Sequence, residues 1–282
     1  MPQSTIYRVI AHKGGTFELS CGLDTFTTPA RGNLKRTGIL VGDMVEYDGN
    51  AITRVLPRTN SLIRPSVANI DQAIVIVAPV PMPDFYLIDK MLVNCKVLGI
   101  GAVICVNKID IEGAEGLVAT LKRQFDSDAK IVTSSVAAKD TLRLRRTLSG
   151  KLSALCGQSA VGKSSLVNAI TRNNDRNIGE LSGNLRGRNT TTRSGIVALG
   201  GDTFVIDTPG FGNLDIFGIE YRELDNYYAD YLLASSGCRF RGCSHIVEPD
   251  CAVRELVERG KLDEDRYIRF VEMYTELKMR SV

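Results

Sequence analysis

Five short motifs in this 282-residue chain occur in an order that is rotated relative to the usual order in a phosphate-loop fold. In the usual order the phosphate loop comes first and the segments that read a base come last. Along this chain the motifs are Asn107-Lys108-Ile109-Asp110, Ser134-Ser135-Val136-Ala137, residues 157–164, Thr190-Thr191-Thr192 and Asp207-Thr208-Pro209-Gly210. The base-reading candidates precede the phosphate loop, so the order predicts a circularly permuted α/β fold.

The phosphate-loop candidate satisfies the pattern G-x-x-x-x-G-K-S completely, between a strand-like run at 152–156 and a helical stretch at 164–170. In such a loop, backbone N–H groups point at phosphate oxygens, and the helix N-terminus adds a favourable field. Lys163 would neutralise the β- and γ-phosphates, and the Ser164 hydroxyl would ligate Mg²⁺. The candidate contacts here are Gly157, Gln158, Ser159, Ala160, Val161, Gly162, Lys163, Ser164 and Ser165.

Two later segments supply the remaining groups of a magnesium and γ-phosphate site. Asp207 ends the apolar run at 203–206, where its carboxylate would face the Mg²⁺ shell, and Gly210 offers a backbone N–H. Thr190, Thr191 and Thr192 lie in a stretch rich in Gly, Asn and Arg, which is typical of a loop. One of the three, taken here as Thr191, would reach Mg²⁺ only when a γ-phosphate is present, which predicts a switch.

The motif at 107–110 favours guanine over adenine. The Asp110 carboxylate can accept from guanine N1–H and from the 2-amino group, and adenine offers neither donor. An unpaired buried acceptor costs about 1 to 3 kcal/mol, more if charged, so one side chain can select the nucleotide. Asn107 would brace the phosphate loop, the Lys108 stem would lie along the base, and Ile109 completes the motif. Ser134, Ser135 and Val136 could offer a backbone N–H to guanine O6, although an ordinary strand-to-helix turn would look the same.

Chain organisation and charge suggest more than one domain. Residues 1–66 contain short β-like runs at 16–20, 44–47 and 51–56 separated by turn residues, which predicts a small β-barrel. Buried apolar runs then alternate with helical stretches, which predicts a largely parallel sheet with helices on both faces. Residues 1–66 carry 8 Lys/Arg against 5 Asp/Glu, whereas residues 67–282 carry 27 of each. This N-terminal excess fits a weak nucleic-acid contact or simply a solvated surface.

Composition excludes some classes of protein. Hydrophobic residues at 44% and charged residues at 24% are ordinary for a globular chain, and no apolar run approaches the roughly 18 residues of a membrane helix. The first residues lack a basic segment followed by an apolar one, so no secretory signal is expected. We therefore expect a cytoplasmic protein that makes no membrane contact. In a reducing compartment, seven cysteines would not form a disulfide framework.

Three of the cysteines cluster with one of the two histidines near the C-terminus. Cys238, Cys243, His245 and Cys251 have the spacing C-x4-C-x-H-x5-C, a Cys3His set that suits tetrahedral Zn²⁺ in a closed structural site. The other cysteines, Cys21, Cys95, Cys105 and Cys156, are expected to be unrelated apolar residues. Further along, Tyr267, Phe270, Val271, Tyr274 and Leu277 mark one face of an amphipathic helix that Asp263-Glu264-Asp265 would begin.

With these motifs assembled, the chain resembles the circularly permuted ribosome small-subunit-dependent GTPase A family. The resemblance is carried by the five motifs, the Cys/His cluster, Val41-Gly42-Asp43, Leu56-Pro57-Arg58 and residues 60–65 and 67–72. It implies an OB-fold barrel that binds RNA at 1–66, a permuted GTPase domain at 67–218 and a zinc-binding domain with C-terminal helices at 219–282. It also implies a monomeric switch that binds GTP and GDP, contacts rRNA, and hydrolyses GTP during late maturation of the small (30S) ribosomal subunit, which stimulates it.

The chain departs from familiar GTPases where water would be activated. The position after Gly210, often Gln, is Phe211, and the position before the threonines, a histidine in the resembling family, is Asn189. Asn cannot act as a base near neutral pH, so Asn189 is carried only as a candidate that positions water. Slow basal hydrolysis is expected. Because the last motif leads directly toward the Cys/His cluster, we also hypothesise that nucleotide state moves the zinc domain.

Two other functions fit parts of the sequence. One is a passive RNA-binding module, in which the barrel uses basic groups and aromatics such as Tyr7, Phe17, Phe26 and Tyr47 and the nucleotide site is structural. The other is a GTPase that serves a different RNA or protein partner. Intact Lys163, Ser164 and Asp207 favour an enzyme over the passive module.

Overall fold

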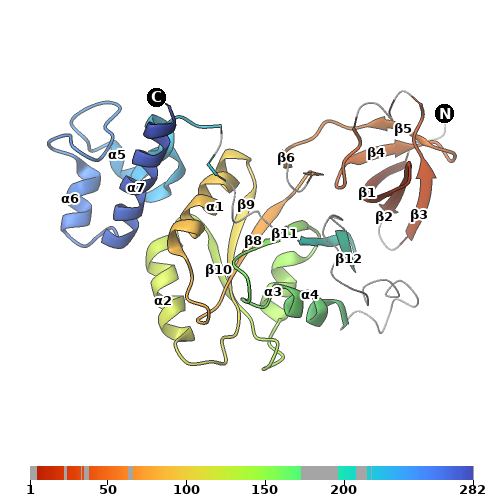
Figure 1. Ribbon diagram of the computed structural model, residues 1–282, viewed down its shortest axis with the longest axis horizontal. Helices are drawn as coiled ribbons and strands as arrows, with labels where there is room; N and C mark the ends of the chain where they lie inside the picture. Colours follow the sequence, from red (N-terminus) through yellow and green to blue (C-terminus); the bar gives the residue numbers. More distant parts are fainter. Residues whose placement is uncertain are drawn as a thin grey trace.

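The computed structural model describes residues 5–21, 24–32, 34, 38–62, 66–172, 196–207, 215–216 and 218–281. A β-barrel and a group of C-terminal helices lie on opposite sides of a central α/β domain (Figure 1). The mixed architecture predicted from the sequence is confirmed in all three parts. Among the helices that these residues form, none combines the length and the apolar character that crossing a bilayer requires.

The barrel is a five-stranded antiparallel sheet with the order β3-β2-β1-β4-β5. Its strands are β1 (Thr5–Lys13), β2 (Thr16–Cys21), β3 (Asp24–Pro29), β4 (Met44–Tyr47) and β5 (Ile52–Val55). A bridge between Ala30 and Ile52 brings the end of β3 to β5 and closes the barrel. Val9, Leu19 and Phe17 fill its interior. Phe17, one of the aromatics considered above for RNA stacking, is therefore committed to the core, where it stacks on His12 with ring centroids 4.7 Å apart.

One β-bulge connects the barrel to the central domain. In the pairing of β1 with β2, Val9 faces Leu19 and Ala11 faces Glu18, so Ile10 is the extra residue. Val9 belongs to the barrel core, whereas Ile10 packs into the main core of the central domain. Nearby, the Arg8 guanidinium lies 5.6 Å from the centre of the Phe204 ring. The barrel is thus packed against the edge of the central sheet.

The central sheet has six strands in the order β10-β9-β8-β11-β13-β12, and only β12 runs antiparallel to its neighbour. The strands are β8 (Gln72–Val77), β9 (Gly101–Val106), β10 (Lys130–Thr133), β11 (Leu152–Cys156), β12 (Ile196–Gly200) and β13 (Thr203–Asp207). A small pair, β6 (Ser61–Leu62) and β7 (Val67–Ala68), precedes them. The predicted parallel sheet is confirmed.

Helices cover both faces of this sheet (Figure 1). They are α1 (Phe85–Val97) and α2 (Ala114–Phe125) on one face, and α3 (Leu142–Leu148) and α4 (Lys163–Arg172) on the other. Successive side chains of β8 alternate between the two cores: Val75 joins the core under α1 and α2, and Ile74 and Ile76 join the core under α3 and α4. An unbroken apolar run is what a strand buried on both faces requires.

The C-terminal part is helical and has its own core. It consists of η3 (Tyr221–Tyr227), α5 (Ala229–Ser235), α6 (Ala252–Glu258) and α7 (Glu264–Arg280). The predicted amphipathic helix is confirmed as α7, with Phe270 and Leu277 buried. Asp263 caps it by accepting a hydrogen bond from the Arg266 N–H at 3.0 Å, and Glu264 and Asp265 form its first turn.

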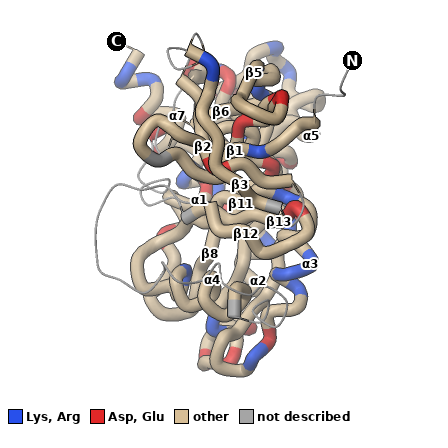
Figure 2. Tube along the Cα trace, turned by 90° about the vertical axis from the view of Figure 1, so that its right-hand side faces the viewer, with Lys and Arg blue, Asp and Glu red and all other residues tan. Residues whose placement is uncertain are grey.

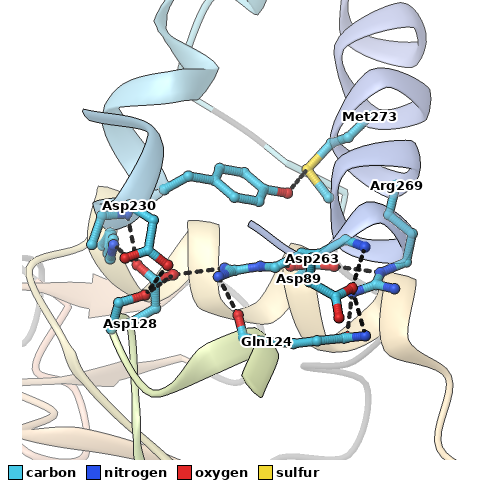
Figure 3. Close-up of polar contacts among 12 residues, drawn as sticks. Asp89, Gln124, Asp128, Asp230, Asp263, Arg269 and Met273 are labelled. Carbon is cyan, nitrogen blue, oxygen red and sulfur yellow. Dashed lines mark hydrogen bonds and ion pairs between the residues drawn. The ribbon is translucent and has the colours of Figure 1, made fainter. Parts of the chain in front are cut away.

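A buried ionic network fastens α7 to the central domain (Figure 3). Arg266, only 4% exposed, donates from Nε to Asp89 of α1 at 3.1 Å and lies 2.7 Å from Asp128, which follows α2. Arg269 donates to the second oxygen of Asp89 at 2.6 Å and to the Gln124 side chain at 2.8 Å. The Arg266 guanidinium also lies between two rings, 4.7 Å from Phe125 and 4.8 Å from Tyr228.

This docking bears on the hypothesis that nucleotide state moves the zinc domain. Both carboxylates facing Arg266 are fully buried, so separating α7 from α1 and α2 would leave charges without partners in the interior. Any such motion must therefore carry α1 and α2 with it or break the network. The hypothesis itself stays a prediction.

Candidate nucleotide site and metal centre

The strand order brings the separated motifs to one edge of the sheet. Strand β11, which leads into the phosphate loop, lies between β8 and β13, and β9 and β10 follow on the far side of β8. Leu155 of β11 pairs with Asp207 of β13, so the backbone of Asp207 lies one strand away from the start of the loop. The carboxyl ends of parallel strands form a common edge, which is where α/β sheets bind ligands.

The phosphate loop follows the sheet edge closely. Gly157 has φ +133°, and a Cβ there would lie 2.2 Å from the Ile76 carbonyl oxygen, so only glycine fits. Lys163 begins α4, and its Nζ donates to the carbonyl oxygens of Gly157 at 2.8 Å and Gln158 at 2.7 Å. The loop therefore curves around this ammonium group, and the contact of Lys163 with phosphates stays a prediction. Ser159, Ala160, Ser164 and Ser165 are exposed, and Val161 is buried.

The motif at 107–110 is hydrogen-bonded directly to the phosphate loop. The Asn107 side-chain amide donates to the Val161 carbonyl at 2.9 Å and accepts from the Ser134 hydroxyl at 3.2 Å. Lys108 Nζ donates to the Ala160 carbonyl at 2.9 Å and to the Val80 carbonyl at 2.8 Å. The predicted bracing of the loop by Asn107 is present, and Lys108 adds a second link between the base-reading and phosphate elements.

The carboxylate expected to read guanine is held by the next motif. The Ser135 hydroxyl donates to Asp110 Oδ1, and Ile109 N–H donates to the Ser134 carbonyl at 3.3 Å. The backbone N–H of Ser134 is already bonded to Val106, and that of Ser135 to Asp140. Neither is therefore free for guanine O6. Within the described residues, the N–H groups of Val136 and its successor Ala137 have no partner, so of this motif only these two are available to guanine O6, and that contact stays a prediction.

Several predicted residues lie outside the part of the chain that the structure describes. These are Asn189, Thr190, Thr191 and Thr192, together with Thr208, Pro209, Gly210 and Phe211. For Asp207 only the backbone position on β13 is given. Their roles at Mg²⁺ and at the γ-phosphate stay predictions.

The Cys/His cluster forms a compact donor set. The ligand atoms of Cys238, Cys243, His245 and Cys251 all lie within 4.8 Å of one another. His245 Nδ1 lies 3.4 Å from Cys251 Sγ and 3.6 Å from Cys238 Sγ, and these two sulfur atoms are 3.9 Å apart. Zn–S bonds of 2.3 Å and Zn–N bonds of 2.1 Å give tetrahedral edges of about 3.6 to 3.8 Å, so the residues fit a zinc ion.

The other ring nitrogen of the histidine is also occupied. His245 Nε2 lies 3.4 Å from a carboxylate oxygen of Asp225 in η3, an arrangement that orients metal-bound imidazoles. The Tyr267 hydroxyl donates to the His245 carbonyl at 2.7 Å, which ties α7 to the cluster. The cysteines outside the cluster differ in kind: burial raises the pKa of the Cys95 thiol to about 12 and of the Cys105 thiol to about 11. Cys95, Cys105 and Cys156 are buried core residues, as expected, whereas the expectation was wrong for Cys21, which is exposed at the end of β2.

Comparison with known proteins settles the family. The family model described as RsgA GTPase matches residues 55–217, which include every one of the five motifs. The chain belongs to the RsgA GTPase family. A curated relative from Thermotoga neapolitana, named small ribosomal subunit biogenesis GTPase RsgA, is 42% identical over 259 residues, covering 88% of this chain and 87% of its own. A relative of the same name from Ruminiclostridium cellulolyticum is 38% identical over 269 residues, covering 90% and 87%.

Two solved structures agree with this fold. YjeQ from Thermotoga maritima matches with a TM-score of 0.82 and 33% identity, covering 96% of this chain and 98% of that one. YloQ, described as a circularly permuted GTPase, matches with a TM-score of 0.80 and 30% identity, covering 99% and 96%. The predicted permuted GTPase fold and the predicted family are confirmed.

Two contacts around the RsgA site were missed by reasoning from the sequence. The Gln158 side chain accepts a hydrogen bond from the Asp84 N–H at 3.1 Å, and Asp84 in turn caps α1 by accepting from Leu87 N–H at 3.0 Å. Asp225, the partner of His245, lies 20 residues before it in the chain. Neither belongs to a motif, and only the position of Asp84 ahead of an apolar helical stretch hinted at a helix cap.

Proposed function

We propose that this protein is a GTP-hydrolysing switch that acts in late maturation of the small ribosomal subunit and is stimulated by that subunit. The observation that carries the proposal is the direct bonding of the base-reading motif to the phosphate loop, from Asn107 to Val161 and from Lys108 to Ala160. This bonding supports a single guanine-nucleotide site built from the two distant segments. The names of the curated relatives support the choice of partner.

The proposed roles follow the chemistry of each group. Lys163 neutralises the β- and γ-phosphates, and the Gly210 N–H meets the γ-phosphate. Ser164, Thr191 and Asp207 would hold the Mg²⁺ that accompanies GTP, which would supply positive charge beside the phosphates. Asp110 selects guanine. The four residues of the Cys/His cluster would hold one structural Zn²⁺.

Hydrolysis in the isolated protein is proposed to be slow. Phe211 cannot orient a water molecule for attack, and Asn189 cannot accept its proton. A partner that completes such a site contributes about 10³ to 10⁵ in rate in other GTPases. We propose that the small subunit supplies or orders the missing group, so that GTP is hydrolysed quickly only after the protein has bound the subunit.

The proposed division of labour assigns residues 1–66 to RNA binding, 67–218 to GTP and 219–282 to the zinc domain, in a monomeric cytoplasmic protein. The barrel offers an aromatic cluster in which Tyr7 and Phe26 have ring centroids 5.1 Å apart and Phe26 and Tyr47 4.8 Å apart. These half-buried rings support stacking with unpaired bases. Light scattering of the purified protein, which should give the mass of one chain, checks the oligomeric state.

The decisive experiment measures the GTPase rate against small-subunit concentration. The rate should rise and saturate, and Lys163→Ala should abolish the stimulated rate while the fold is retained. Large subunits serve as the control partner. Near-zero hydrolysis with and without small subunits would refute the proposal and favour the passive RNA-binding module.

A further inference from the structure

The segment between the base-reading turn and strand β11 carries a concentration of positive charge that the proposed chemistry does not use. Residues 139–151 contain five basic residues, Lys139, Arg143, Arg145, Arg146 and Lys151, and one acidic residue, Asp140. Helix α3 forms the centre of this segment, and its Lys/Arg positions lie on one outer side of the molecule in Figure 2. All except the half-buried Arg145 are exposed.

Three of these cations, Lys139, Arg143 and Arg146, lack carboxylate partners, whereas most other arginines whose side chains the structure describes have one. Among the described residues, nine arginines form ion pairs, at positions 31, 54, 58, 123, 239, 259, 266, 269 and 280. Within the described residues, Lys139, Arg143 and Arg146 form no ion pair, and the only bond from Arg143 is a 3.4 Å contact to the Thr133 hydroxyl. Arg143 and Arg146 are three residues apart on α3 and so lie on the same face.

One arginine of the segment has a structural role, which separates it from the others. Arg145 donates to the carbonyl oxygens of Ala169, at 3.1 Å, and Ile170 near the end of α4. It thereby anchors α3 to α4. Anchoring explains why one arginine is present, but it leaves the two exposed arginines without a function inside the molecule.

The β12–β13 hairpin connects this segment to the barrel. The end of α3 is attached to the β12–β13 hairpin, where Gly150 N–H donates to the Thr203 hydroxyl at 2.9 Å and Phe204 N–H donates to the Lys151 carbonyl at 2.8 Å. Arg8 of the barrel packs on the same Phe204. In Figure 2 the barrel strands, the hairpin and α3 follow one another on the side facing the viewer.

We propose that the basic surface formed by Lys139, in the turn before α3, and by Arg143 and Arg146 of α3 binds the phosphate backbone of small-subunit rRNA. The proposal rests on the proposed function, since it extends the RNA contact from the barrel onto the GTPase domain. Unpaired guanidinium groups match phosphate oxygens, and each neutralised phosphate releases counterions. This surface contributes to affinity and to orientation on the subunit and carries no base specificity.

The test compares the salt dependence of binding for Arg143→Gln/Arg146→Gln with that of the unaltered protein. Binding to small subunits and to protein-free small-subunit rRNA is measured between about 50 and 200 mM salt. Losing two phosphate contacts should reduce the slope of log K against log salt by about 1.5 to 2 and weaken binding roughly tenfold. Lys122→Gln/Lys278→Gln, which neutralises two exposed cations on α2 and α7, is the matched control and should leave the slope unchanged.

Several outcomes decide the matter. GDP affinity of the α3 variant should equal that of the unaltered protein, and the stimulated GTPase reaction should need more subunits for half-saturation while reaching the same maximal rate. An unchanged salt slope would overturn the inference. A defect with intact subunits but none with protein-free rRNA would also overturn it and point to a ribosomal protein. If the unaltered protein did not bind subunits at all, the proposed function would fail, and this inference with it.

Discussion

Arg266 provides a sharp test of how the C-terminal helices are held. Its guanidinium faces Asp89 at 3.1 Å and Asp128 at 2.7 Å, and both carboxylates are fully buried. Substitution by Met keeps an unbranched apolar stem against the rings of Phe125 and Tyr228 but removes the charge. The change therefore measures what the ion pairs contribute to stability while most of the apolar packing is kept.

The expected loss in free energy of unfolding follows from the buried carboxylates that lose a positive partner. Removing one partner of a buried ion pair costs about 3 to 5 kcal/mol, because the remaining charge is left uncompensated. Here Asp89 keeps Arg269 and Asp128 keeps Lys96, so the lower end, about 3 kcal/mol, is expected. With a urea m-value of about 3 kcal/mol/M, the unfolding midpoint of the C-terminal helices should fall by about 1 M.

Two probes in one urea titration measure this. Release of a fluorescent GDP analogue reports the nucleotide site, and colorimetric capture of Zn²⁺ reports the C-terminal domain. In Arg266→Met, zinc release should precede nucleotide release. Arg239→Met is the matched control, because Arg239 and its partner Asp250 have side chains 66% and 63% exposed, and such pairs contribute about 0 to 1 kcal/mol.

A double-mutant cycle with Asp128→Asn separates charge from altered packing. The two substitutions should couple by more than about 1 kcal/mol, because the second removes a carboxylate that the first leaves unpaired. A loss for Arg266→Met no larger than that of the surface control, together with zero coupling, would refute the claim that buried ion pairs hold the C-terminal domain in place.

Further predictions concern the nucleotide site, the metal and the barrel. Asp110→Asn should weaken GTP binding by at least about 1 to 3 kcal/mol and admit xanthosine nucleotides, which calorimetry would detect; unaltered GTP affinity would mean that the base lies elsewhere. Gly162→Ala should lower GDP affinity at least tenfold, because its Cβ would lie 2.5 Å from the Asn107 amide nitrogen at a φ of +98°; equal affinity by calorimetry would contradict this. Chelation of zinc should unfold the C-terminal helices, measured as lost circular dichroism, and full helicity after complete metal removal would argue against a structural ion. Hydrogen bonds from the Ala51 N–H and its neighbour lower the pKa of Asp48 to about 2, so the stability that this group contributes is present above about pH 4 and lost as pH falls toward 2. A carboxyl NMR titration of Asp48 with a midpoint near 4 would contradict that account.

The phosphate loop and the metal cluster could be predicted from the sequence because their chemistry is local. A phosphate loop needs eight consecutive residues, and the Cys3His set spans only residues 238–251, so spacing alone brings the groups within reach. The same holds for β11 and β4, whose predicted bounds match the observed ones. The strand Thr5–Lys13 was not predicted, because its bulge interrupts the alternation that marks a half-buried strand.

Which distant groups meet was decided only by the tertiary structure. Asn107 follows β9 and Val161 follows β11, and the two meet because only β8 lies between these strands in the sheet. Arg266 contacts Asp89 across 177 residues because α7 packs on α1. Ile10 leaves the barrel core because it is itself the extra residue of the bulge in β1. Sequence spacing determines geometry within a turn or a loop, whereas contacts between elements depend on how strands are ordered and how helices pack. Candidate nucleotide-binding groups were therefore readable from the chain, whereas the contacts that join their segments were visible only in the folded structure.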